Sequence, residues 1–114
     1  MTHMSHMIRL QITPILAKRV IHTVGPMGEK ELLLADAYRN SLTVAYNEEL
    51  SSIAFPCIST GVYGYPNEPA ARVAIKTVMD FLGEHEEISL VIFCVFLDKD
   101  LAIYEDLLEQ MINE

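Results

Sequence analysis

The sequence predicts an α/β fold, a three-layer α/β/α sandwich with a mostly parallel sheet, on three observations. Segments with strand-like and helical patterns alternate along the 114 residues. The later strand segments are continuous apolar runs, which is typical of parallel strands buried on both faces. The composition, 51% hydrophobic and 21% charged, suits one compact domain with a sizeable core.

Four segments have the character of strands. Apolar and polar residues alternate over 8–13 until Pro14 interrupts the pattern, which predicts a half-buried strand. Residues 19–24 form a short β-rich run that ends at a Gly-Pro pair. Residues 52–58 and 88–96 are longer apolar runs, and we expect both to be buried strands of a parallel sheet.

Three amphipathic helices are predicted between and after these strands. The first covers 29–48, the second follows Asn67, and the third follows Asp98. Asn67 and Asp98 are residue types that cap helix N-termini. The expected apolar faces consist of Leu34, Ala35, Tyr38, Leu42, Ala45 and Tyr46 in the first helix, Ala71, Ala74, Ile75, Val78 and Leu82 in the second, and Leu101, Tyr104, Leu108 and Met111 in the third.

Charge and composition exclude several classes of partner. The net charge is −8, and no cluster of Lys and Arg offers a surface for nucleic acid or for an anionic membrane. The longest apolar stretch, 90–97, is too short to cross a bilayer and no signal sequence opens the chain, so we expect a cytoplasmic protein. Cys57 and Cys94 lack the spacing of metal ligands, and reduced thiols are expected, with no metal and no cofactor.

The segment STGVYGYP at 59–66 is the main candidate for a binding site. It follows the predicted strand at 52–58, and ligands of open α/β sheets bind at the carboxyl ends of strands. Gly61 and Gly64 would let the backbone approach a bulky anion, and the next helix N-terminus adds positive potential. The alternative is that both glycines only supply positive φ in a tight turn. A P-loop is excluded, because no Lys-Ser or Lys-Thr pair follows.

Three segments in this order resemble the C-terminal portion of the macro domain family, which binds ADP-ribose. They are RVIHTVGP at 19–26, SIAFPCISTGVYGYP at 52–66 and VIFCVF at 91–96. The resemblance covers roughly residues 16 to 112. It implies a truncated macro-like domain over 8–114, preceded by a tail or tag-like segment at 1–7.

The resemblance also implies the ligand-binding residues. In the family, the matching segment wraps the diphosphate and distal ribose of ADP-ribose, mainly through backbone amides. Tyr63 would pack beside the distal ribose and Phe96 against the adenine, although an ordinary core phenylalanine is the alternative for Phe96. The implied site consists of Ser59, Thr60, Gly61, Val62, Tyr63, Gly64 and Phe96. His85, between glutamates, is expected in a solvated loop, and Tyr104 in the core.

Complete macro domains carry further motifs that do not occur in these 114 residues: a GDI-type motif, a NAAN-type asparagine segment and a GGGVDGAI-type loop. The family includes ADP-ribosyl hydrolases and phosphatases of ADP-ribose 1″-phosphate. In the hydrolytic branch, the asparagine and aspartate of those segments position and activate water. No catalytic residue is therefore identified here, and we expect hydrolase activity to be absent or much reduced.

The absence of the NAAN-type segment raises a question about the sheet. In the family, the strand that carries this segment lies between the strands that match 19–24 and 52–58. Its absence leaves strand edges unpaired, and such edges pair with other chains. The sheet could close up directly, the strand at 8–13 could replace it, or two copies could pair. We expect a homodimer through exposed or swapped strands. A degenerate remnant that folds as an oligomer and no longer binds nucleotide is the alternative function.

Overall fold

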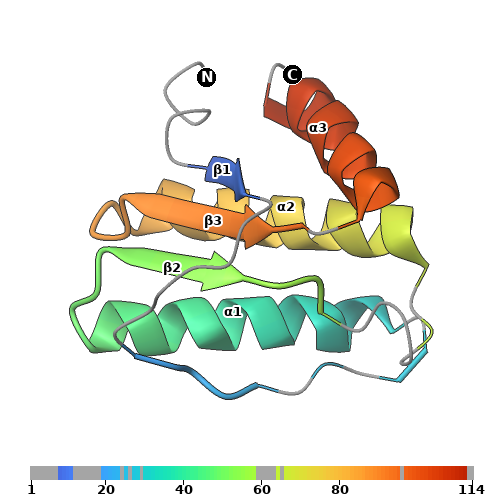
Figure 1. The fold of residues 1–114 in the computed structure, drawn as a ribbon. Helices are drawn as coiled ribbons and strands as arrows, with labels where there is room; N and C mark the ends of the chain where they lie inside the picture. The colour runs from blue at the N-terminus through green and yellow to red at the C-terminus, as the bar shows by residue number, and fades with distance from the viewer. Residues whose placement is uncertain are drawn as a thin grey trace.

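The computed structural model describes residues 8–11, 19–23, 25, 27–28, 30–58, 64, 66–95 and 97–112. Strands and helices alternate along this part of the chain, as Figure 1 shows. The elements are β1 (Ile8–Gln11), α1 (Glu31–Asn47), β2 (Ser52–Phe55), α2 (Asn67–Glu84), β3 (Leu90–Cys94) and α3 (Asp98–Ile112). The predicted α/β class, with a parallel sheet and helices, is confirmed.

The sheet has the strand order β1-β3-β2, and both pairings are parallel. Val91 lies opposite Ile8 on one side and Ile53 on the other, and Phe93 lies opposite Leu10 and Phe55. Because the strands are parallel, their carboxyl ends share one edge of the sheet. Both α2 and α3 begin at this edge, and α1 also begins on that side of the molecule (Figure 1).

One face of the sheet forms the core with all three helices. The ring of Phe93 is 1% exposed and lies 6.3 Å from the ring of Phe55, 6.5 Å from Tyr38 of α1 and 5.1 Å from Tyr104 of α3. Helix α2 packs between α1 and α3 and adds residues such as Ile75, which is fully buried. The three helices therefore cover the Phe93 face together.

The opposite face of the sheet is much less covered in the part of the chain that the structure describes. Arg9, Ser52 and Ala54 are exposed there, and Ile92 and Cys94 are half-buried. No helix among the described residues lies on this face, because all three are used on the Phe93 side. The expected sandwich is thus present as a sheet and one helical layer within the described residues.

The strand predicted at 19–24 is wrong for the residues that the structure describes there. Residues 19–23 have no regular structure, and Val20 is 74% exposed. Arg19 instead pairs with Glu48 at 3.5 Å on the surface. A short β-rich run becomes a strand only where a neighbouring strand is available to pair with it. Ile21 packs against the core, but no described strand pairs with this run.

The strand predicted at 52–58, β2, is shorter and more exposed than predicted. It ends at Phe55, because Pro56 has no N–H to continue the ladder. In the described residues β2 pairs only with β3, so its other edge is unpaired there. The strand at Ile8–Gln11 joins the far side of β3 and does not fill the edge of β2, where a replacement strand was considered.

Candidate functional site

The predicted binding residues lie mostly outside the described residues. Ser59, Thr60, Gly61, Val62, Tyr63 and Phe96 belong to that group, so their roles stay predictions. The structure does place the residues on either side of them. Ile58 follows the carboxyl end of β2, Asn67 begins α2, and Leu97 directly precedes α3. The candidate site is therefore bounded by two strand ends and two helix starts.

Gly64 is the one predicted binding residue whose conformation is described. It is exposed, its φ is +79°, and no atom lies within 4 Å of the place where a Cβ would stand. A positive φ is a conformation that L residues rarely adopt, so glycine is required by the backbone rather than by a close neighbour. Gly64 thus has the positive φ that the turn interpretation expects, and this conformation is also compatible with a binding role.

The side chain of Tyr38, on α1, contacts the residue that precedes segment 59–66. Its side chain is 1% exposed and its ring packs edge-on against Phe55, with centroids 4.9 Å apart. The backbone N–H of Ile58 donates a hydrogen bond to its hydroxyl oxygen, with 3.4 Å between the two heavy atoms. Tyr38 falls on the predicted apolar face of the helix, so its body fills the core while its hydroxyl holds the chain just before Ser59.

The hydroxyl of Tyr104, on α3, and the thiol of Cys57 lie near the hydroxyl of Tyr38. Burial raises the pKa of both tyrosines well above their usual value. Burial and the nearby Asp100 carboxylate raise the pKa of Cys57 to about 11. All three groups are thus protonated near neutral pH, and none of them is a base or a nucleophile there.

Asn67 and Asp100 connect the starts of α2 and α3. The side-chain amide of Asn67 donates a hydrogen bond to the Asp100 carboxylate, which is 7% exposed in the first turn of α3. The prediction that Asn67 caps α2 is wrong, because Pro66 occupies the cap position and no side chain caps the helix. Asn67 is the first helical residue, and its amide is directed to the neighbouring helix instead.

Three of these polar residues, Tyr38, Tyr104 and Asp100, were not identified from the sequence as part of the site. Tyr38 and Tyr104 fall on the apolar faces of their helices, and both are buried as predicted. Asp100 lies next to Asp98 and Lys99, which are exposed, so nothing in the local pattern marks it as buried. A usable signal was Asn67, a polar residue that ends the glycine-containing segment.

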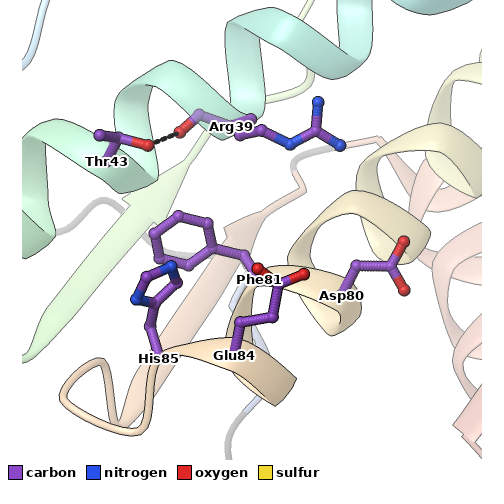
Figure 2. A pocket seen from close by; sticks show the side chains of 6 residues that line it. All are labelled: Arg39, Thr43, Asp80, Phe81, Glu84 and His85. Carbon is purple, nitrogen blue, oxygen red and sulfur yellow. Dashed lines mark hydrogen bonds between the residues drawn. The ribbon is translucent and has the colours of Figure 1, made fainter.

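A groove lies elsewhere, between α1 and the carboxyl half of α2 (Figure 2). It has a volume of about 330 Å³ and is lined by Arg39, Thr43, Asp80, Phe81, Glu84 and His85. The Thr43 hydroxyl donates to the backbone of Arg39, whose guanidinium pairs with Asp36 at 3.6 Å.

His85 lies in the loop after α2, as predicted, but its side chain is packed against two aromatic rings rather than fully solvated. Its ring lies 4.3 Å from that of Phe81 and 4.5 Å from that of Tyr46, and the residue is half-buried.

Two cysteines, Cys57 and Cys94, are free thiols. No group of three His, Cys, Asp or Glu residues within the described ranges could hold a metal ion. No helix in those ranges is long and apolar enough to cross a membrane.

Comparison with protein families gives a match to the macro domain over residues 5–74. An ADP-ribose glycohydrolase, MACROD2, of Xenopus laevis is 53% identical over 96 residues, which cover 78% of this chain and 23% of that protein. An O-acetyl-ADP-ribose deacetylase of Cronobacter sakazakii is 41% identical over 110 residues, which cover 92% of this chain and 61% of that protein. The chain thus spans less than two thirds of the length of these relatives.

Solved structures show the same likeness. A macrodomain of Trypanosoma brucei in complex with ADP-ribose superposes with a TM-score of 0.73 at 43% identity, over 75% of this chain and 37% of that one. A macrodomain of Oceanobacillus iheyensis with ADP superposes with a TM-score of 0.77 at 44% identity, over 81% of this chain and 50% of that one.

Proposed function

This chain belongs to the macro domain family, and from that premise we propose that it binds ADP-ribose through residues 59–64. The observation that carries the proposal is the place of the two ends of this segment. Ile58 follows β2 and Asn67 begins α2, at the edge of the sheet where α3 also begins. Parallel α/β sheets bind ligands at this edge, and relatives are named for their action on ADP-ribose compounds.

Backbone amides, rather than long-range attraction, would supply the affinity for the diphosphate. The chain carries a net charge of −8, and the first turns of α2 and α3 contain Glu68, Asp98 and Asp100. These carboxylates oppose the positive potential of the two helix N-termini. Direct hydrogen bonds from N–H groups to phosphate oxygens do not depend on net charge in this way.

A titration followed by amide resonances would locate this binding. Addition of ADP-ribose is expected to shift the amide signals of Gly61 and Gly64, while those of residues that line the groove between α1 and α2, such as Thr43, stay in place. Shifts confined to the groove would place the ligand elsewhere and contradict the proposed site.

We expect no hydrolysis of ADP-ribosyl groups by the 114-residue chain. Among the described residues near the site, Tyr38, Cys57 and Tyr104 hold their protons at neutral pH, and Asp100 is buried against Asn67. A general base must be free to accept a proton from water. Release of ADP-ribose from an ADP-ribosylated protein, measured with the purified chain, should equal the rate without protein. Turnover that increases with the amount of chain would contradict this.

A homodimer through the edge of β2 is a second proposal, favoured by one observation. The strand SIAF contains no charge and no proline, and within the described residues its outer edge is unpaired. Natural sheets usually protect such edges with charged residues.

We also propose one domain from residue 8 onward, and a cytoplasmic location stays a prediction of the sequence.

Ala54→Lys tests the dimer. Ala54 is exposed on β2, so lysine should leave the monomer folded and disfavour pairing at this edge. Light scattering after gel filtration should give twice the monomer mass for the wild type and one monomer mass for the variant. Ala102→Lys, at an exposed position of α3, serves as the matched control and should stay dimeric. A wild-type monomer would overturn the proposal.

A further inference from the structure

We propose that five buried or half-buried polar residues position segment 59–66 for its ligand by fixing both of its ends. We call them the anchor network: Tyr38, Cys57, Asn67, Asp100 and Tyr104. The inference rests on the proposed function, because it assigns to these residues the geometry of the same site. They are positioning residues.

The first end of the segment is fixed by the two tyrosines. Tyr38 accepts a hydrogen bond from the N–H of Ile58, and the Tyr104 hydroxyl lies near the hydroxyl of Tyr38 and the thiol of Cys57. Tyr38 and Tyr104 come from α1 and α3, which cover the sheet on either side of α2. Ile58 is thus hydrogen-bonded to α1, and Cys57, the residue before it, lies near Tyr104 of α3.

The second end is fixed by the pair of Asn67 and Asp100. Asn67 is the residue at which the chain enters α2, and its amide donates to a carboxylate of α3 that is 7% exposed. The position of Asn67, where the segment joins α2, therefore depends on α3. Between the two ends, the backbone of Gly64 takes a φ of +79° that only glycine adopts freely.

Position, rather than stability, is the physical reason for burying these groups. A buried polar group that loses its partner is destabilising, whereas an apolar core of the same shape would need no partners. The surrounding core is apolar, with Phe55 and Phe93 beside Tyr38. Buried hydrogen bonds in such surroundings leave few arrangements in which every polar group keeps a partner. They therefore hold Ile58 and Asn67, the two ends, in one relative position. A segment held in its binding conformation loses less entropy when ligand binds.

Two variants remove the anchors and two serve as controls. Tyr38→Phe removes the acceptor for Ile58 with little change of volume, and Asp100→Leu removes the acceptor for Asn67. Asp100→Asn keeps an acceptor oxygen for Asn67 and is the conservative control. Tyr46→Phe changes a half-buried tyrosine at the other end of α1, beside His85.

Two readouts separate positioning from general stability. Calorimetry should show that Tyr38→Phe and Asp100→Leu weaken ADP-ribose binding about tenfold, while Asp100→Asn and Tyr46→Phe bind like the wild type. Without ligand, amide hydrogen exchange of Gly61 and Gly64 should become faster in the first two variants only. Exchange at Val78, in the core of α2, should stay as slow as in the wild type because the core remains closed.

The outcomes distinguish the inference from the proposed function. Wild-type affinity and wild-type exchange in both Tyr38→Phe and Asp100→Leu would overturn the inference. Faster exchange at Gly61, Gly64 and Val78 alike would also overturn it, since the residues would then act on stability alone. A wild-type chain that binds no ADP-ribose would overturn the proposed function, and the exchange data would still decide whether the network fixes the segment.

Discussion

Replacing Phe93 with alanine is expected to lower the free energy of unfolding by about 3–5 kcal/mol. Phe93 is 1% exposed, and its ring contacts those of Phe55, Tyr38 and Tyr104. Truncation would leave a cavity where the middle strand meets helices α1 and α3. A domain of this size is stable by about 5–15 kcal/mol, so the loss is a large share of the total.

Chemical denaturation measures this loss, and Ile92→Ala is the matched control. Ile92 is the preceding residue of β3, points to the opposite face and is half-buried. Its truncation should cost about 1 kcal/mol, at the low end for a large apolar side chain, because the site is only partly enclosed. Equal losses in the two variants would contradict a core that lies on the Phe93 face alone.

Replacing Gly61 with glutamate is expected to weaken ADP-ribose binding by at least about a hundredfold, or about 2.7 kcal/mol. Gly61 is central in the predicted phosphate-binding segment. A side chain there would occupy the space of the diphosphate, and its carboxylate would repel it at short range. Calorimetric titration of the variant should give no saturable heat under conditions where the wild type saturates.

Gly83→Glu is the control for this substitution. Gly83 lies in the last turn of α2, is exposed, and a Cβ there would meet no atom within 4 Å. The variant adds the same charge far from the site and should bind like the wild type. Equal loss of binding in both variants would mean that added negative charge, and not the place of Gly61, weakens the complex.

The helices and the middle strand could be predicted from the sequence because their patterns are local. The period of apolar residues in α1 and α2 is visible along the chain, and Leu90–Cys94 is almost wholly apolar. The strand at 19–24 could not be judged in this way. Its β-branched residues fit a sheet, but strand formation depends on a partner far away in the sequence, and no described residue supplies one.

The candidate site was predicted in outline from the position of its segment between β2 and α2. The anchor network was not, because a hydrogen bond such as that from Asn67 to Asp100 spans 33 positions of sequence. The partial burial of His85 was missed for the same reason. Its neighbours in sequence are charged, whereas the rings that contact it belong to Phe81, one helical turn away, and to Tyr46 of α1.

Calorimetric titration of the 114-residue chain with ADP-ribose tests the central claim most directly. Binding through segment 59–64 predicts a saturable heat with one ligand per chain, and adenosine monophosphate, which lacks the distal ribose and one phosphate, should bind more weakly. A folded chain that gives no heat with ADP-ribose at millimolar concentration would contradict the claim. The segment would then be an inherited turn, and the alternative of an oligomeric remnant without nucleotide binding would stand.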